Sequence, residues 1–156
     1  LRDSVKGDPE GRAQMALGQY IAGMGFSNVG LGIVHSMAHP LSAVYDIPHG
    51  VACAILLTPV LKFNAPSTAD KYRDIAVAMG VKNTEDMSIE QARQACIEAV
   101  EKLSVDVGIP QKLTQLGVKE EDLQLLSESA LVDACTPGNP RDVSVEAIKE
   151  IYKAIM

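Results

Sequence analysis

The 156-residue chain has no tryptophan, two phenylalanines and four tyrosines, and its lysines and arginines are scattered rather than clustered. Proteins that bind nucleic acids use clusters of basic side chains and, for single strands, aromatic rings that stack on the bases. With a formal net charge of −6 at pH 7, the composition argues against nucleic acid as a partner.

Cysteine is scarce as well. Cys53, Cys96 and Cys135 lie far apart, are odd in number and form no CxxC pair, which favours free thiols in a reducing compartment. The chain has no start of the signal-peptide kind, and its longest apolar run, Val51 to Leu61, is too short to span a bilayer. We therefore expect a cytoplasmic protein with no membrane partner.

Strand patterns are also missing, because no segment alternates at period two for more than a few residues, whereas helical spacing and helix caps recur. Asp8-Pro9 is a typical helix start, and Ser88 with Gln91 forms a capping-box pattern. A chain of this length can bury one core. We expect one all-α domain, residues 1–156, with helices near 9–24, 28–45, 50–63, 68–79, 88–107, 110–116, 119–134 and 144–155.

The apolar helices at 28–63 should form the centre of this domain. Small residues between Asn28 and Tyr45 let helices approach closely, so this segment is predicted to be buried, with Pro40 kinking or breaking it. The preceding helix keeps a helical apolar spacing through Met15, Leu17, Tyr20, Ile21 and Met24. The methionines at 15, 24, 37 and 79 are interpreted as core residues.

All three histidines of the chain lie between residues 30 and 50. His35 and His39 are four residues apart, so a helix places them on one face with Cβ atoms roughly 5–6 Å apart. His49 stands between Pro48 and Gly50 at a turn and can point back at the preceding helix. Imidazole is a common metal ligand and proton carrier. The residues alone leave open whether these histidines bind a metal or make hydrogen bonds in a core.

The segment GLGIVHSMAHPLSAVYDIPHG, residues 30–50, resembles the signature region of the iron-containing (group III) alcohol dehydrogenases. Further stretches match the family in order, including MALGQYIAGMGFSN, PHGVACAILLTPVLKFNA, KYRDIA, DVGIP and NPR. The resemblance covers almost the whole chain and is most specific at residues 15–66. Ser42, where many relatives have glycine, is a small-for-small difference.

The resemblance implies the C-terminal helical domain of the dehydroquinate synthase-like, iron-containing alcohol dehydrogenase fold. It implies that His35 and His49 are metal ligands, for Fe²⁺ or Zn²⁺, with an Asp and a His from upstream completing the set. It implies that His39 lines the pocket beside the nicotinamide and substrate, as a proton-relay or positioning residue. NAD would bind mainly to an N-terminal α/β domain that this chain lacks. Cys135 and the Asn139-Pro140-Arg141 loop are interpreted as structural, although the family places them near the cleft.

The function implied is a metal- and NAD-dependent alcohol dehydrogenase or aldehyde reductase for a small aldehyde or diol of the lactaldehyde or 1,2-propanediol type. Because the chain starts at Leu1 with what reads as the end of a helix, we expect it to be part of a longer protein and to be inactive alone. The whole protein is expected to form a homo-oligomer, such as a dimer. The alternative is a non-catalytic helical module that binds a metal or a partner.

Overall fold

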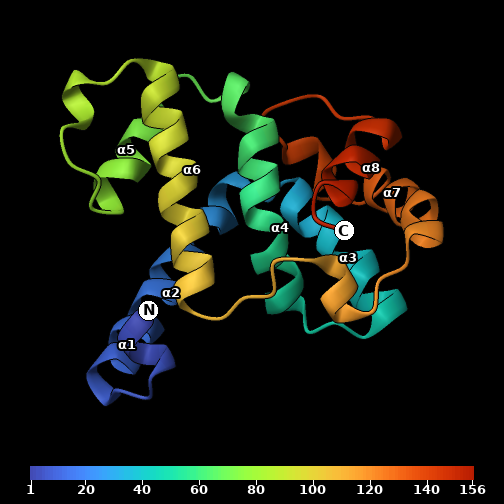
Figure 1. The fold of residues 1–156 in the computed structure, drawn as a ribbon, viewed down its shortest axis with the longest axis horizontal. Coiled ribbons are helices and arrows are strands. Elements are labelled where there is room, and N and C mark those ends of the chain that lie inside the picture. Colours follow the sequence, from blue (N-terminus) through green and yellow to red (C-terminus); the bar gives the residue numbers. More distant parts are fainter.

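Every regular element in the computed structural model, which describes residues 1–156, is a helix (Figure 1). Short 3-10 turns link several of the α-helices, at Ala65–Ser67, Thr84–Asp86, Leu113–Leu116, Glu120–Asp122 and Thr136–Gly138. The α-helices are α1 (Arg2–Val5), α2 (Pro9–Val29), α3 (Ile33–Tyr45), α4 (His49–Asn64), α5 (Lys71–Ala78), α6 (Ile89–Asp106), α7 (Leu123–Leu131) and α8 (Val145–Lys153). The expectation of an all-α fold is confirmed.

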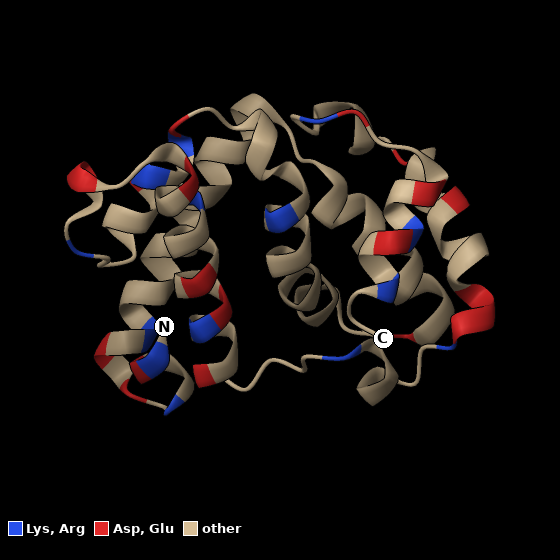
Figure 2. Ribbon diagram, turned by 45° about the horizontal axis from the view of Figure 1, so that its top comes forward, with Lys and Arg blue, Asp and Glu red and all other residues tan.

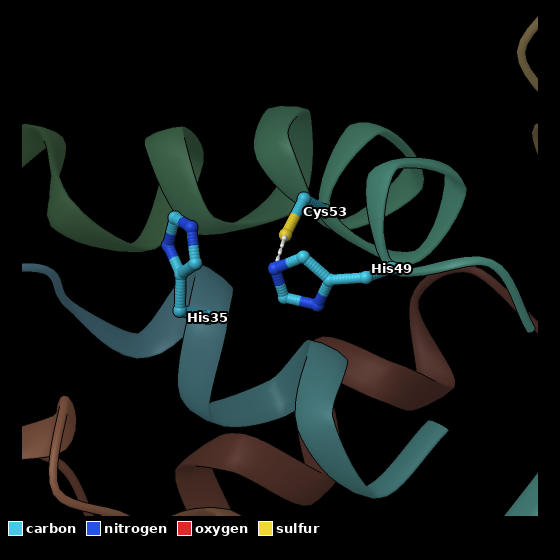
Figure 3. A group of neighbouring side chains, drawn as sticks. All are labelled: His35, His49 and Cys53. Atoms are coloured by element: carbon cyan, nitrogen blue, oxygen red, sulfur yellow. Dashed lines mark hydrogen bonds between the residues drawn. The ribbon is translucent and has the colours of Figure 1, made fainter. Parts of the chain in front are cut away.

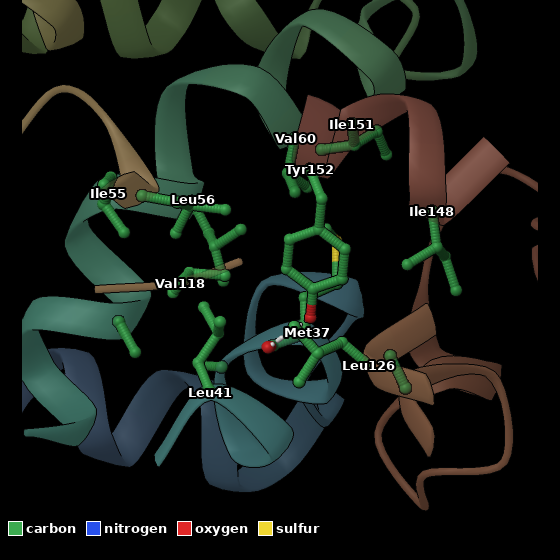
Figure 4. Packing of buried hydrophobic residues seen from close by; sticks show 14 of the residues in the cluster. Met37, Leu41, Ile55, Leu56, Val60, Val118, Leu126, Ile148, Ile151 and Tyr152 are labelled. Carbon is green, nitrogen blue, oxygen red and sulfur yellow. Dashed lines mark hydrogen bonds between the residues drawn. The ribbon is translucent and has the colours of Figure 1, made fainter. Parts of the chain in front are cut away.

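The main core lies where α3 packs against α4 and α7, and where α7 packs against α8. Figure 4 shows the side chains that fill it, among them Met37, Leu41, Ile55, Leu56, Val60, Val118, Leu126, Ile148, Ile151 and Tyr152. The buried Tyr152 hydroxyl donates a 2.6 Å hydrogen bond to the Met37 carbonyl, so α8 is joined to the middle of α3 by a polar contact as well. The predicted central pair of apolar helices is thus confirmed.

A smaller core joins α5 to α6 beside α4. Tyr72 of α5 is buried in it and donates a 3.0 Å hydrogen bond to the Leu61 carbonyl near the end of α4. The α6 helix begins with the predicted capping box, in which the Ser88 hydroxyl accepts from the Gln91 amide and the Gln91 side chain accepts from the Ser88 amide. These contacts hold the α5–α6 pair against one side of the helix that begins with His49.

The boundary between the first two long helices differs from the prediction. The α2 helix continues to Val29 because the Ser27 and Asn28 side chains bond back to the carbonyls of the preceding turn, at 2.7 Å each. The helix ends at Gly30, whose φ of 79° is a left-handed value that other residues rarely adopt. The next helix therefore begins at Ile33, not Asn28, and it continues unbroken through the buried Pro40.

The prediction that the methionines are core residues is confirmed for Met37 and wrong for Met24. Met37 is fully buried, whereas Met24 is 48% exposed on α2. No residue of α2 is buried, and this helix makes its main contacts with α1. Helical apolar spacing identifies a face that can be buried, but no segment of this chain lies against that face of α2. The large apolar side chains exposed along α2 are Leu17, Tyr20, Ile21, Met24, Phe26 and Val29.

The charge distribution and the hydropathy of α4 bear on possible nucleic-acid and membrane partners. Figure 2 shows lysine and arginine spread among acidic residues along the ribbon. By length and composition alone, His49–Ser67, with a mean hydropathy of 1.2, is apolar enough to cross a membrane. This helical stretch is longer than the apolar run at 51–61 because it includes polar residues on both sides. The α4 helix packs against α3, α6 and α8. A core helix with such contacts passes the same test of length and hydropathy.

Candidate metal centre

The three histidines of α3 and α4 face one another across the junction of the two helices. His35 and His39 lie one turn apart on α3, and His49 is the first residue of α4. The reversal between the helices passes through Asp46, whose φ of 55° is left-handed. The ring centroid of His49 lies 5.4 Å from that of His35 and 5.3 Å from that of His39. The structure therefore brings the predicted metal-binding pair, His35 and His49, together.

A thiol completes the first group of donors. Cys53 lies one turn after His49 on α4, and Figure 3 shows its sulfur directed at the His49 ring, which in turn faces His35. Donor atoms of His35, His49 and Cys53 all lie within 4.8 Å of one another, and the Cys53 Sγ atom is 3.4 Å from His49 Nε2. The sequence analysis did not select Cys53 as a site residue. Its spacing of four from His49 on a helix is the signal that identifies it.

Burial changes the proton affinity of these groups. It lowers the pKa of His35, and the nearby positive charges of His49 and His39 lower that pKa further. A neutral imidazole has the free lone pair that a metal ligand needs. Burial raises the pKa of the Cys53 thiol. The metal-free group therefore holds a neutral imidazole at His35, ready to bind a metal, and a protonated thiol at Cys53, which would first have to lose its proton.

His39 belongs to a second group of donors. Its Nδ1 atom lies 2.7 Å from Asp133 Oδ2, and Asp133 Oδ1 accepts a 2.8 Å hydrogen bond from the Cys135 amide. Burial pushes the pKa of Asp133 upward, but the hydrogen bonds from the Cys135 amide and the His39 ring outweigh it and hold this pKa below its usual value. The carboxylate is therefore charged and orients the imidazole. His39 stays exposed on its other side, with a side-chain exposure of 44%.

Asp133 is not among the site residues that the sequence predicts. It lies 94 positions after His39, in the turn that follows α7, and a single aspartate in a turn is ordinarily a turn former. Its role depends on packing of α7 against α3, which no local pattern shows. The rings of His39 and His49 stack with an interplanar angle of 18°, so the carboxylate-bound imidazole lies directly beside the candidate metal ligands.

In the loop after Asp133, one residue lies at the site and the later residues hold the loop against α4. Cys135 has donor atoms within 4.8 Å of His39 and Asp133, so it lies at the site rather than only in a structural loop. Asn139 forms two amide hydrogen bonds with Asn64, of 2.8 and 2.9 Å. Arg141 donates to the Phe63 carbonyl at 2.6 Å, with its guanidinium 4.2 Å from the Phe63 ring centroid. These contacts make the Asn139-Pro140-Arg141 segment structural, as predicted.

The donor chemistry fits a divalent transition metal. Imidazole suits both iron and zinc, and thiolate suits zinc in particular. Catalytic zinc sites have three protein ligands and an open position. His35 and His49 supply two imidazoles from two packed helices, which leaves room for further donors and for a substrate oxygen. The roles of His35, His49 and His39 remain predictions at this point, now with a geometry that suits them.

Comparisons with known proteins show which family the chain resembles in sequence. The chain matches the model described as "Fe-containing alcohol dehydrogenase family, C-terminal" over residues 1–156. It is 59% identical to the lactaldehyde reductase of Escherichia coli K12 over 152 residues, which is 97% of this chain and 40% of that protein. It is 45% identical to the 1,3-propanediol dehydrogenase of Citrobacter freundii over 142 residues, which is 91% of this chain and 36% of that protein.

The fold agrees as well. The solved structure of an iron-containing alcohol dehydrogenase from Thermococcus thioreducens aligns with 99% of this chain, with a TM-score of 0.82 and 31% sequence identity. The aligned region is 39% of that protein. The chain thus spans about two fifths of the length of these relatives. With a family match along its whole length and a common helical fold, the chain belongs to the iron-containing alcohol dehydrogenase family and corresponds to its C-terminal part.

Proposed function

We propose that residues 1–156 form the metal-holding helical domain of an NAD-dependent alcohol dehydrogenase. Its substrate would be a small aldehyde or alcohol of the lactaldehyde or 1,2-propanediol type, since the relatives at 59% and 45% identity are named as a lactaldehyde reductase and a 1,3-propanediol dehydrogenase. The observation that carries the proposal is the convergence of His35 and His49, whose ring centroids lie 5.4 Å apart on two packed helices. Either Fe²⁺ or Zn²⁺ suits these imidazoles.

The residues of this chain divide the work as follows. His35 and His49 hold the cation, which when bound supplies a Lewis acid for the substrate oxygen. NAD supplies the hydride chemistry and would be bound by the part of the protein outside this chain. His39 directs Nδ1–H at Asp133, so its Nε2 atom is the one that exchanges a proton with the substrate hydroxyl or with solvent. Asp133 fixes the tautomer and the ring orientation.

Three further expectations complete the proposal. The free thiols Cys53, Cys96 and Cys135 favour a reducing compartment, so we place the enzyme in the cytoplasm. The exposed apolar face of α2 is consistent with further protein lying against it, either the rest of the subunit or a second subunit of a dimer. Because the relatives are more than twice as long, the domain alone is expected to lack NADH oxidation.

The test is an assay of the intact gene product. The metal is removed with a chelator, and NADH oxidation by lactaldehyde is measured before and after addition of Fe²⁺ or Zn²⁺. We expect activity to vanish with the metal and to return with one of the two ions. Metal binding with no aldehyde-dependent NADH oxidation, for lactaldehyde and other short aldehydes alike, would instead support the non-catalytic binding module.

A further inference from the structure

The contact between His39 and Asp133 has a second, buried contact beside it. The Thr136 hydroxyl lies 2.8 Å from the Ser36 hydroxyl. Ser36 is three residues before His39 on α3, and Thr136 begins a 3-10 turn three residues after Asp133. The two segments therefore meet at two hydrogen bonds, with the same spacing of three residues on each side, and they run in opposite directions.

The Thr136 hydroxyl has two partners. It also lies 2.7 Å from the carbonyl oxygen of Ala130, in the last turn of α7. A carbonyl only accepts and a hydroxyl has one proton, so both bonds form when Thr136 donates to Ala130 and accepts from Ser36. The Thr136 amide donates a 3.1 Å hydrogen bond to the Asp133 carbonyl. Thr136 thus ties the end of α7 and the backbone of Asp133 to α3.

The turn that carries Asp133 is fixed at its ends and open between them. Ala130 and Thr136 are buried, whereas none of the residues between them is. The hydroxyl of Thr136 therefore joins the two buried ends of the turn to each other. Because Asp133 lies in the open middle, its position depends on these ends.

The two contacts between α3 and this turn differ in burial. Ser36 is fully buried, whereas the His39 side chain is 44% exposed. Water screens an exposed ionic contact, and ordering its two side chains offsets much of the attraction. A buried hydrogen bond is stronger, and a buried hydroxyl left without a partner is costly. The buried pair of Ser36 and Thr136 is therefore the contact that fixes how the turn lies against α3.

We propose that Ser36 and Thr136 are positioning residues for the second group of donors. They hold the turn after α7 on α3, and so keep Asp133 in contact with the His39 ring. This inference rests on the proton-exchanging role proposed for His39. When the hydroxyl of Thr136 is removed, the turn is released from α3 and His39 loses the acceptor for its Nδ1–H group. The tautomer with a free lone pair on Nε2 then becomes less populated.

A double-mutant cycle in the intact protein tests this inference. Thr136→Val removes the hydroxyl and keeps the shape of the side chain. We expect kcat to fall by about tenfold, the low end of the range for outer partners, with unchanged metal content and little change in KM. In the Asp133→Asn background, the same substitution should change kcat by less than about twofold, because the contact that it supports is already lost. Thr136→Ser keeps the hydroxyl and should restore most of kcat.

Ser127→Ala is the matched control for loss of a buried hydroxyl. Ser127 is fully buried on α7, and its hydroxyl donates a 2.6 Å hydrogen bond to the Leu123 carbonyl in the same helix. This variant should lower thermal stability, as Thr136→Val does, but leave kcat unchanged. Ser36→Ala is a milder second variant, because it keeps the bond between Thr136 and Ala130. It should lower kcat by a smaller factor than Thr136→Val.

The ring nitrogen chemical shifts of His39 give a measurement that needs neither metal nor activity. The metal-free intact protein is labelled with ¹⁵N-histidine, and His39→Gln identifies the signals of this ring. In mildly alkaline solution, we expect the proton mainly on Nδ1 in the wild type and in Thr136→Ser. In Thr136→Val it should move toward Nε2, as in Asp133→Asn.

The outcomes separate this inference from the proposed function. An unchanged tautomer and kcat in Thr136→Val, or losses of kcat that multiply when it is combined with Asp133→Asn, would overturn the positioning role and leave the metal centre intact. A loss of kcat in Ser127→Ala equal to that in Thr136→Val would overturn it as well, by assigning the loss to stability. A wild type without aldehyde-dependent activity would overturn the proposed function, and the tautomer of His39 in Thr136→Val would still decide the positioning role.

Discussion

The two donor groups of this site contain the same kinds of atoms but differ in spacing and surroundings. His35, His49 and Cys53 project from two packed helices, with donor atoms within 4.8 Å of one another and a 3.4 Å hydrogen bond between Cys53 and His49. His39 and Asp133 lie in hydrogen-bond contact, and the ring keeps one side open to solvent. All three rings lie within 6.4 Å of one another by centroid, and the proposed function gives metal holding to His35 and His49 and proton handling to His39.

The largest expected effect comes from removing one histidine of each group. His49→Ala should lose the metal and lower kcat/KM by at least about a thousandfold, because a bound cation contributes several kcal/mol to stabilising charge in the transition state. His39→Ala should keep the metal and lose about a hundredfold to ten-thousandfold, the range for a general acid or base. Metal content and steady-state rates of the two variants are measured side by side.

If metal content falls equally in His49→Ala and His39→Ala, both histidines help to hold the metal, and the two groups do not differ in function. Lys82→Gln, at an exposed position in the loop after α5, is the control for handling losses. Its metal content and kcat/KM should equal those of the wild type.

Asp133→Asn should give a smaller effect on the proton-handling group alone. The amide can still contact His39 but carries no charge, so it no longer fixes the Nδ1–H tautomer. Outer partners of this kind are worth about 10–100-fold in activity. We expect kcat to fall by this factor with unchanged metal content and little change in KM.

A merely structural role for Asp133 would give a different result. The pH dependence of kcat in Asp133→Asn should differ in shape from that of the wild type, because the variant removes the charged carboxylate that contacts the His39 ring. Asp133→Glu should restore part of kcat, since it returns the charge. Unchanged pH dependence together with lower thermal stability in both variants would show that Asp133 acts only on folding.

Local patterns in the sequence predict the helices and half of the site. The spacing of His35 and His39, and the Pro48-His49-Gly50 turn, give local geometry that a helix and a turn impose directly. The caps at Asp8 and Ser88 likewise specify helix starts that the structure confirms. These features depend only on residues within four positions of one another. Over that range, the geometry of a helix or turn fixes how the side chains lie relative to one another.

The missed features depend on contacts between distant segments. Asp133 reaches His39 only because α7 packs on α3, and the exposure of α2 follows from the absence of any buried residue along it. The end of α2 was also placed wrongly, because Ser27 and Asn28 bond back into the helix instead of ending it. Both side chains can favour either outcome, and the left-handed Gly30 decides between them.

Tyr152→Phe should lower stability without altering either donor group. The variant removes the hydroxyl that donates to the Met37 carbonyl, which lies on α3 between His35 and His39. Loss of a buried hydrogen bond of this kind costs about 1 kcal/mol. Urea unfolding should report this decrease, while metal content and kcat stay at the wild-type values. Loss of metal in this variant would mean that the histidine geometry depends on α8 as well as on α3 and α4.

The smallest expected effect is a pH dependence of stability in the metal-free protein. Burial, with the charges of His49 and His39, lowers the pKa of His35 in the folded state. An unfolded histidine titrates near pH 6.5, so below that pH the unfolded chain binds the proton more readily than the folded protein does. The contribution of a neutral His35 to stability is therefore complete above about pH 6.5 and is lost progressively as the pH falls toward the lower, folded-state pKa.

Urea midpoints of the metal-free protein between pH 7.5 and 5 measure this loss. We expect the midpoint of the wild type to fall with decreasing pH, and that of His35→Gln to fall less, because glutamine binds no proton in either state. Zinc should steepen the dependence in the wild type, since protons compete with the metal for the same imidazoles. Equal pH dependence in the wild type and His35→Gln would mean that the ring of His35 accepts a proton as freely in the folded protein as in the unfolded chain. The metal-holding group would then lack the neutral donor that distinguishes it from the His39–Asp133 pair.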